Sequence, residues 1–259
     1  MKKITTFLYV ILTMPVISFA QKTVTAESII SSINNHTAVN LKDVQVTGDL
    51  DFTRLADMKL EQQNSSDKVY ISTVTIPVSF SNCSFNGKVL GYYNPDAGKP
   101  FVKSSTVYNA NFTADVSFEN CSFEKYVSFK YSIFEAGVSF GKSHFNDGAE
   151  FKYTKFEEGP KFIGSLFKDE AVFKYVEFPK GFDFSEVTFE TIADFKYAKF
   201  MDGGSFSNAS FKNGSDFKYA GFSKSVDMKG ASFSGSNDFK YTTLDNEKTS
   251  VDELVNKKS

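Results

Sequence analysis

Lysine and tyrosine recur together at a fixed interval through the second half of the chain. The tripeptide Phe-Lys-Tyr begins at residues 129, 151, 173, 195, 217 and 239, so each copy lies 22 residues after the previous one. Lysine attracts anionic groups, and a tyrosine ring combines an apolar body with a polar hydroxyl that suits sugars or protein partners. A fold that aligns the copies would form a linear binding strip. Its members would be Lys130, Tyr131, Lys152, Tyr153, Lys174, Tyr175, Lys196, Tyr197, Lys218, Tyr219, Lys240 and Tyr241.

The same residues are also compatible with a purely structural role. Lysines stacked on neighbouring strands repel one another. Carboxylates often stand directly before the phenylalanine, at Glu150, Asp194, Asp216 and Asp238, where they would neutralise the lysines. Stacked tyrosines and paired charges would then stabilise the fold as a solvated ladder. From the sequence, the binding strip and the structural ladder both stay open.

Other reactive residue types do not assemble into a recognisable site. Residues 137–143 read Gly-Val-Ser-Phe-Gly-Lys-Ser, which is one residue short of a phosphate-binding loop, and no helix is expected after them. The two histidines, His36 and His144, have no cysteine or second histidine nearby to complete a metal site. The formal net charge of -2 argues against a basic nucleic-acid surface. We therefore expect no cofactor, no metal, no nucleic-acid partner and no enzyme activity.

Phenylalanine reveals the architecture that would position these side chains. The chain has 30 phenylalanines and no tryptophan in 259 residues. From Phe112 onward, a large apolar residue recurs at alternating steps of six and five. The series contains Phe112, Phe118, Phe123, Phe129, Phe134, Phe140, Phe145, Phe151, Phe156, Phe162, Phe167, Phe173, Phe178, Phe184, Phe189, Phe195, Phe200, Phe206, Phe211, Phe217, Phe222, Met228, Phe233, Phe239 and Leu244. This spacing fits neither a strand nor a helix, and a fixed long period indicates a solenoid.

The steps add up to a coil with four sides. Two steps of five and two of six make one coil of 22 residues, with one inward phenylalanine on each side. The residue two positions earlier, such as Ala149 or Ala193, is small or apolar and faces the same way along an extended chain. We predict an all-β solenoid, a quadrilateral β-helix of about eight coils, with the extra residues absorbed as bulges at two opposite corners. A three-sided β-helix is the alternative, but four equal anchors per coil argue against it.

The motif of a small residue two positions before a leucine or phenylalanine resembles that of the pentapeptide-repeat family. The similarity covers roughly residues 41–244, and it implies a right-handed, four-sided β-helix. The coil of 22 residues departs from the family's usual coil of four pentapeptides. Some cytoplasmic members mimic DNA and bind gyrase, and some form homodimers through a solenoid end. The lysine column and the expected export of this chain disagree with the DNA-mimic role.

The first residues of the chain have the features of a signal peptide. Lys2 and Lys3 give a charged start, an apolar run follows, and small residues stand before the expected cleavage site after Ala20. The run is too short for a comfortable membrane span. We therefore expect residues 1–20 to be removed, which leaves a periplasmic or secreted protein with no integral membrane segment.

Both ends of the mature chain are predicted to carry short caps. Residues 21–40 should form an N-terminal helical cap, with Thr25 as N-cap and three isoleucines on one face. Residues 245–259 should form a C-terminal cap or tail, with Ser250 at the start of a short helix. The β-helix is expected between these caps.

Two insertions interrupt the first coils. Residues 78–85 recur at 116–123 with seven of eight residues identical, at an offset that exceeds one coil by 16 residues. This places an insertion within residues 86–106, and a second irregularity lies near residues 58–68. We expect both at the corner just before the side that carries Phe-Lys-Tyr, where they form a lateral protrusion of the kind that often binds ligands in solenoids.

Cys83 and Cys121 occupy the same position in adjacent coils. Adjacent coils lie about 4.8 Å apart, which is within the range of a disulfide, and an exported protein meets an oxidising compartment. Two buried thiols that act as small hydrophobic side chains are the other interpretation.

These features favour a non-catalytic exported module that binds an unknown protein or glycan, or that is structural. A polysaccharide-active β-helix enzyme is the alternative, although scattered carboxylates on a solenoid surface are more often solvating. A DNA-mimic topoisomerase binder is a third possibility, drawn only from the family resemblance.

Overall fold

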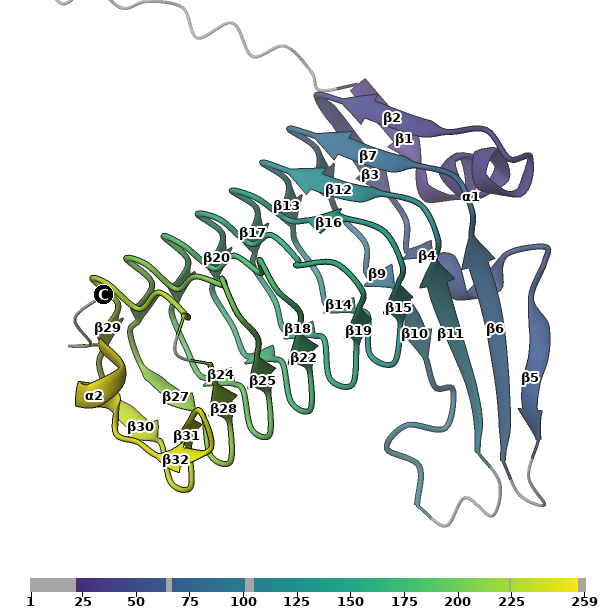
Figure 1. Cartoon of the computed structure of the whole chain (residues 1–259). Helices are drawn as coiled ribbons and strands as arrows, with labels where there is room; N and C mark the ends of the chain where they lie inside the picture. Colours follow the sequence, from purple (N-terminus) through teal and green to yellow (C-terminus); the bar gives the residue numbers. More distant parts are fainter. Residues whose placement is uncertain (1–21, 64–66, 101–104, 224, 256–259) are drawn as a thin grey trace, which may run out of the picture.

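The computed structural model describes residues 22–63, 67–100, 105–223 and 225–255 of the chain. Within these residues the chain winds into a solenoid, in which strands of successive coils pair mainly in parallel (Figure 1). Four sheets, named A to D here, run along the described part of the solenoid. The predicted β-solenoid is therefore confirmed. The expected signal peptide, residues 1–20, lies outside the described residues.

The strands are mostly short, and each sheet is built from strands of successive coils. Sheet A contains β1 (Lys22–Thr25), β3 (Val44–Thr47), β8 (Ser84–Phe85), β13 (Ser122–Phe123), β17 (His144–Phe145), β20 (Leu166–Phe167), β23 (Thr188–Phe189), β26 (Ser210–Phe211) and β29 (Ser232–Phe233). Sheet C contains β4 (Leu50–Asp51), β9 (Val89–Leu90), β14 (Val127–Ser128), β18 (Ala149–Glu150), β21 (Ala171–Val172), β24 (Ala193–Asp194), β27 (Gly214–Asp216) and β30 (Ser236–Asp238).

The other two sheets complete the coil. Sheet D contains β5 (Lys59–Gln63), β6 (Lys68–Val74), β10 (Tyr92–Tyr93), β11 (Thr106–Phe112), β15 (Ile133–Phe134), β19 (Lys155–Phe156), β22 (Glu177–Phe178), β25 (Lys199–Phe200), β28 (Gly221–Phe222), β31 (Thr243–Leu244) and β32 (Glu247–Lys248). Sheet B contains β2 (Val39–Lys42), β7 (Val78–Ser81), β12 (Val116–Glu119) and β16 (Val138–Ser139). Single parallel bridges continue sheet B from Ser139 as far as Asp227.

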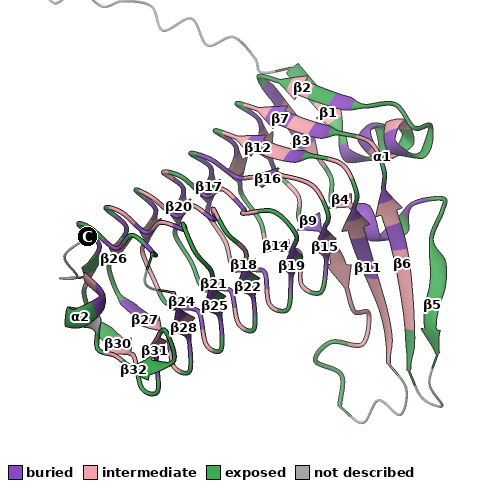
Figure 2. Ribbon diagram, viewed as in Figure 1, coloured by how far each residue is buried: buried purple, intermediate pink, exposed green. Residues whose placement is uncertain are grey.

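Stacked phenylalanines fill the interior of the solenoid. Phe123 pairs with Phe145, and Phe145 pairs with Phe167, so each residue lies beside the one 22 positions later. Partner rings stack, with centroids 4.4 Å apart for Phe145 and Phe167. Rings from adjacent sides meet edge to face, as Phe151 and Phe162 do at 5.3 Å and 86°. All five rings are buried. Figure 2 shows buried residues along the strands of the regular coils and exposed residues mainly on the loops, whereas β5 of the protrusion is exposed.

The corners of a coil alternate between two kinds. At the corner between sheets C and D, and at the opposite corner between sheets B and A, a hydrogen bond closes a tight turn. Phe129 O accepts the N–H of Ser132 at 3.0 Å, and Phe140 O accepts the N–H of Ser143 at 3.2 Å. The corners between sheets A and C and between sheets D and B lie on the six-residue steps. The extra residues of the coil therefore lie at two opposite corners, as predicted, and make those corners wider.

A short helix covers the first coil. Helix α1 (Ala26–Asn34) begins after Thr25, whose Oγ1 accepts the N–H of Ser28 at 3.2 Å. Ile29 and Ile33 are buried on the face that contacts strand β4. Thr25 is therefore the N-cap, and isoleucines form the buried face, as the sequence predicted.

A second helix follows the last coil. Helix α2 (Val251–Val255) begins with a capping box, in which the N–H of Glu253 donates to Ser250 Oγ at 3.3 Å. The N–H of Ser250 donates in return to Glu253 Oε2 at 3.0 Å. Neither helix within the described ranges is long and apolar enough to cross a membrane.

The two insertions extend sheet D sideways beside the first coils. Strands β6 and β11 pair in parallel along their whole length. Strand β5 adds to β6, and β10 adds to β11, both in antiparallel orientation. The result is a lateral protrusion that projects beyond the regular coil (Figure 1). A lateral protrusion at this end of the solenoid was predicted, but the predicted corner was wrong.

The insertions lie one side later in the coil than we expected. Val89 pairs with Val127 in sheet C, so Gly91 is the residue that aligns with Phe129. An insertion confined to residues 86–106, as the sequence predicted, would instead align Val107 with Phe129, since these two residues lie 22 positions apart. The insertion therefore follows the side that carries Phe-Lys-Tyr, at the corner between sheets C and D.

The reason is the geometry of a straight strand. Val107 lies five residues before the buried Phe112, but both belong to β11. An odd spacing within one strand places two side chains on opposite faces, and only a corner would bring both inward. The irregularity near residues 58–68 lies at the same corner, between the 3-10 helix η1 (Phe52–Arg54) and the buried Val74 of β6.

Candidate functional site

The tyrosine of each Phe-Lys-Tyr copy occupies a special backbone position. It is the third residue of the tight turn between sheets C and D, and its φ is positive, as in a type II turn. That position favours glycine or asparagine because a Cβ there approaches the backbone. The φ values lie between 57° and 64° for Tyr131, Tyr153, Tyr175, Tyr197, Tyr219 and Tyr241.

The opposite corner shows that the backbone does not select tyrosine. It also carries a residue with positive φ, and each lies eleven residues before a tyrosine of the first corner. These residues are Asn120, Lys142, Gly164, Glu186, Asn208 and Gly230. The same local geometry therefore accepts several residue types. The positive φ costs a tyrosine about 1–2 kcal/mol per residue. The uniform tyrosine at one corner is therefore explained by its side chain and not by the backbone.

The six tyrosines, named the tyrosine column here, form one continuous stack. Successive ring centroids lie 5.0, 4.6, 4.8, 4.8 and 4.8 Å apart, and no interplanar angle exceeds 15°. Each residue of the column is between 38% and 46% exposed. Because the faces of the inner rings lie against one another, the column presents ring edges and hydroxyls to solvent.

Three of the six motif lysines, Lys130, Lys174 and Lys196, form ion pairs with carboxylates of the following coil. Lys196 Nζ lies 2.7 Å from Asp216 Oδ2, and Lys174 Nζ lies 4.0 Å from Asp194 Oδ2. The hydrogen bond to Asp216 raises the pKa of Lys196, while burial raises the pKa of Asp194. Asp194 and Asp216 are two of the carboxylates that the sequence predicted to neutralise the lysines. These ion pairs therefore reduce the positive charge that an anionic ligand would meet along part of the strip.

The lysines also contact the tyrosine rings directly. Lys152 Nζ lies 5.2 Å from the ring centroid of Tyr153, and Lys240 Nζ lies 5.1 Å from that of Tyr241. Such cation–π contacts hold the lysine against the column rather than out in solvent. The structure thus brings the predicted lysines and tyrosines together, with tyrosine as the more available of the two.

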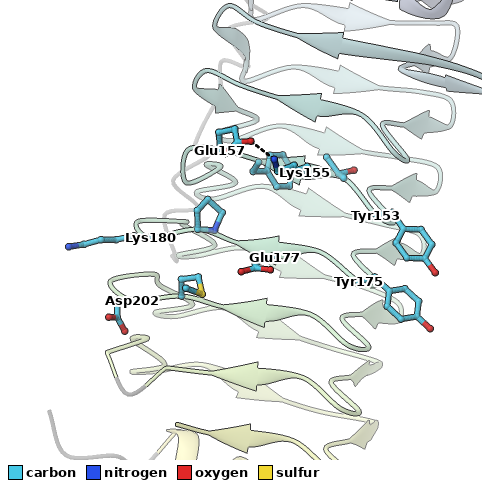
Figure 3. Close-up of a pocket in the computed structure, with 11 residues that line it drawn as sticks. Tyr153, Lys155, Glu157, Tyr175, Glu177, Lys180 and Asp202 are labelled. Atoms are coloured by element: carbon cyan, nitrogen blue, oxygen red, sulfur yellow. Dashed lines mark ion pairs between the residues drawn. The ribbon is translucent and has the colours of Figure 1, made fainter. Parts of the chain in front are cut away.

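A groove in sheet D runs beside the tyrosine column. One hollow of about 700 Å³ has Tyr153 and Tyr175 on one side, and Lys180 and Asp202 on the other (Figure 3). Glu177 projects between the two walls, and an ion pair joins two further lining residues. Rings and charges therefore face one another across the groove.

The hollow continues toward the C-terminal coils. A second hollow of about 510 Å³ is lined by Tyr219 and Tyr241, and both hollows share Met201. Met201 is 44% exposed, which is high for a large apolar side chain. We name the two hollows the sheet D groove. Sequence reasoning did not find it because the outward residues of sheet D do not repeat; the exposed methionine and Pro179 were the available signals.

Aromatic residues of the insertions extend the tyrosine column upstream. Tyr92 contacts Tyr131 with ring centroids 5.8 Å apart, and Tyr93 contacts Tyr108 at 6.3 Å. Tyr70 stacks on Tyr108 at 5.3 Å. These residues lie outside the 22-residue period, so the repeat could not reveal them.

Cys83 and Cys121 are both buried, and both are free thiols in the structure. They lie side by side in adjacent coils, since the following residues, Ser84 and Ser122, are partners in sheet A. The hydrogen bond between the two thiols lowers the pKa of Cys83 and raises the pKa of Cys121. A disulfide between them stays a prediction.

The remaining sequence candidates stand apart from this surface. Residues 137–143 run from β16 to β17, so no helix follows the glycine-rich segment. His144 is an exposed residue of β17 and His36 lies after α1. Among the described residues, no group of three or more His, Cys, Asp or Glu side chains gathers in a way that suits a metal ion.

Comparison with known proteins identifies the repeat of the regular coils. A family model described as pentapeptide repeats (9 copies) matches residues 108–155 and 173–221. A solved structure, described as full-length QnrB1, a plasmid-mediated fluoroquinolone resistance protein, is 14% identical to this chain. The similarity covers 81% of this chain and 94% of that one, but the TM-score of 0.27 is too low to carry an argument. A comparison with curated proteins gave no match.

Proposed function

Since the chain belongs to the pentapeptide-repeat family, we propose that it is a non-catalytic, exported module that binds a protein partner through the tyrosine column and the sheet D groove. One observation carries the proposal: tyrosine is uniform at a backbone position that disfavours it. The opposite corner has the same backbone with varied residues. Selection at this corner therefore acts on the exposed tyrosine side chain.

The geometry of the column favours a protein over a glycan. Sugars bind aromatic residues mainly by packing on the ring face, and the faces of the inner rings are covered by their neighbours. Ring edges and hydroxyls at regular spacing suit the backbone and side chains of a protein. Tyrosine is also enriched at protein interfaces, where its few rotatable bonds keep the entropy loss small.

The size of the surface also supports this proposal. Five spacings of about 4.8 Å make the column about 24 Å long. A single row of rings is narrower than a standard interface, which buries about 800 Å² on each partner. The sheet D groove widens the surface and offers hollows for partner side chains, with Met201 and Pro179 as apolar contacts.

The two other functions have less support. A polysaccharide-active enzyme requires free acid and base groups, but the carboxylates beside the column are engaged by lysines and by backbone N–H groups. A DNA mimic requires a strongly acidic surface, whereas here Lys174 and Lys196 stand among the carboxylates. Neither alternative accounts for the uniform tyrosines.

The proposal includes the finer architecture and the address of the protein. We take the solenoid to be a right-handed β-helix of about eight coils, as expected from the handedness of parallel crossovers and from the period of 22. We take residues 1–20 to be a signal peptide that directs the chain to the periplasm or the medium. Amino-terminal sequencing of the mature protein, with Gln21 expected as the first residue, tests the address.

Affinity capture with matched variants tests the binding surface. Mature protein with Tyr175→Ser and Tyr197→Ser is compared with a control that carries Glu186→Ser and Asn208→Ser. Both pairs replace residues of positive φ on adjacent coils, at opposite corners. We expect a native binding protein, quantified by mass spectrometry, to be lost with the tyrosine pair and retained with the control. Identical profiles for wild type and both variants would count against the proposal.

A further inference from the structure

A third hollow lies where the regular coils meet the insertions. Its volume is about 820 Å³, within the range of small-molecule sites. Its walls come from sheet C, from η1 and from the segment that begins with β10. In Figure 1, β4 and β9 of sheet C and strand β10 lie where the lateral protrusion leaves the regular coils. We name this hollow the insertion pocket.

Gly91 fixes the wall that the insertion contributes. It stands where later coils have phenylalanine, and its N–H donates to Ser128 O at 2.6 Å. A Cβ at this position would lie 2.7 Å from Phe129 Cδ1 and 2.8 Å from Ser132 Oγ. Only glycine lets the chain pass this closely over the core. The following tyrosines of β10 are therefore held at one place beside sheet C.

Two of the aromatic rings in the pocket each carry a cation. Arg54 Cζ lies 5.1 Å from the ring centroid of Tyr93, and Arg54 Nε lies 3.2 Å from Asp51 Oδ2. Lys130 Nζ lies 4.8 Å from the ring centroid of Tyr92. The pocket thus combines aromatic surface with fixed hydrogen-bond donors.

Acceptors are fixed in the same space. Glu150 Oε2 accepts the hydroxyl of Tyr126 at 2.8 Å, and Glu150 Oε1 lies 3.9 Å from Lys130 Nζ. Asp49 Oδ1 accepts the backbone N–H of Lys88 at 2.8 Å. Burial and the charge of Glu150 raise the pKa of Tyr126, so its hydroxyl stays a donor.

The charge of the pocket selects a class of ligand. Three carboxylates, Asp49, Asp51 and Glu150, face three cations, which are Arg54, Lys88 and Lys130. A phosphate or polyanion would meet the carboxylates, and an apolar ligand would strip water from all six charges. A neutral polyhydroxylated ligand meets both donors and acceptors and offers C–H groups to the tyrosines.

We propose that the insertion pocket binds a neutral oligosaccharide of one to three sugar rings. The ligand's hydroxyls bridge the arginine, lysine and carboxylate groups, and its ring lies beside Tyr92 and Tyr126. The pocket adjoins the upstream end of the tyrosine column, because Tyr92 lines it and also contacts Tyr131. The sugar-binding proposal nevertheless depends on the polar groups of the pocket and not on the stacked rings of the column.

Arg54 supplies a direct readout, because it is the sole arginine of the chain. Its guanidinium Nε–H therefore gives a single side-chain arginine signal in a ¹⁵N–¹H spectrum. Mature wild-type protein is titrated with maltotriose, cellotriose, laminaritriose, mannotriose, galactotriose and N,N′,N″-triacetylchitotriose. We expect at least one of these to shift the Arg54 signal in a saturable manner.

Variants then locate the site. Arg54→Lys keeps the charge but loses the planar fork, and the dissociation constant of that sugar should rise about tenfold. Isothermal titration calorimetry measures this constant for wild type and both variants, because Arg54→Lys has no arginine signal. Lys180→Gln, in the sheet D groove, should leave the constant unchanged. If no trisaccharide moves the Arg54 signal of wild-type protein, or if Arg54→Lys and Lys180→Gln bind alike, the proposal is wrong. A shift caused equally by inorganic phosphate would also overturn it.

Discussion

At the scale of the residue, tyrosine at the Phe-Lys-Tyr turn sets two energies against each other. The positive φ costs about 1–2 kcal/mol per residue. Each stacking contact contributes about 0.5–1.5 kcal/mol, and an inner tyrosine such as Tyr175 makes two of them. The two effects nearly cancel. Stability alone therefore gives little reason to place tyrosine at every copy, which is why we look to a partner.

Glycine substitutions at the two corners separate these energies. Glu186 shares the positive φ of Tyr175 but lies at the opposite corner. Glu186→Gly should stabilise the protein by about 0.5–1 kcal/mol, since it relieves the backbone and removes no ring contact. Tyr175→Gly gains the same relief but loses two stacking contacts, so its net effect should lie within about 1–2 kcal/mol of zero. Urea unfolding of the mature protein measures both.

The comparison has a clear contrary outcome. If Tyr175→Gly costs about 4 kcal/mol or more, as large core deletions do, the column is a major structural element of the fold. The uniform tyrosines would then be explained by stability, and the argument for a partner would lose its basis.

Asp194 predicts a pH dependence of a definite sign. Burial raises the pKa of its carboxyl above the ordinary value of 3.8, so the fold favours the neutral form. The stability gained from that preference is present below pH 3.8 and is lost as the pH rises through the folded pKa. Asp194→Asn keeps an acceptor for the N–H of Lys196, and it should be more stable than wild type at neutral pH. The advantage should vanish in acid.

Asp216→Asn is the control for this effect. Asp216 lies 2.7 Å from Lys196, a closer ion pair than the 4.0 Å between Asp194 and Lys174. Its amide variant should lose rather than gain stability at neutral pH. Unfolding midpoints measured near pH 3.5 and pH 7 distinguish the two variants. Equal behaviour of the two would contradict the assigned role of burial at Asp194.

At the scale of the element, neighbouring coils are fitted to one another residue by residue. Phe182 occupies an inward position that is small in most other coils, and it is buried. The equivalent position in the next coil is Gly204, and a Cβ there would lie 1.9 Å from Phe182 Cε1. The oversized residue and the missing side chain are therefore one compensated pair across two coils.

The pair predicts a non-additive double mutant. Gly204→Ala alone should destabilise the protein by about 1–3 kcal/mol through overpacking. In a Phe182→Ala background the same change should cost little, because the ring is absent. Gly221→Ala is the control, since its Cβ would meet no atom closer than Thr243 Oγ1 at 3.5 Å. Additive costs in thermal or urea unfolding would contradict this packing.

The regular elements could be predicted from sequence because one residue type marks every side. Phenylalanine at steps of five and six led to the coil, the inward positions and the stacked motif. The sequence placed the insertions at the wrong corner because Val107 lies five residues before Phe112, which matches the repeat. The two residues belong to one straight strand, so they are not inward residues of successive sides. Only strand pairing, such as Val89 with Val127, reveals the register. The sheet D groove and the insertion pocket depend on residues that do not repeat.

At the scale of the whole molecule, a regular repeat carries two different surfaces. The regular coils display the tyrosine column and the sheet D groove, and the lateral protrusion adds a polar pocket at one end (Figures 1 and 3). The stacked phenylalanine core holds both in place, because each ring contacts the coils on either side. The phenylalanine core thus supports the fold, and the proposed binding specificity depends on surface residues outside that core.

Photo-crosslinking in the native cell tests the central claim most directly. A benzophenone amino acid is placed at Tyr175 in one strain and at Glu186 in another, so that both positions share the same backbone on opposite corners. After irradiation, we predict a covalent adduct with a discrete protein partner from position 175 and none from position 186. The absence of an adduct at 175, or the same adducts from both positions, would contradict the assignment of the tyrosine column as the binding surface.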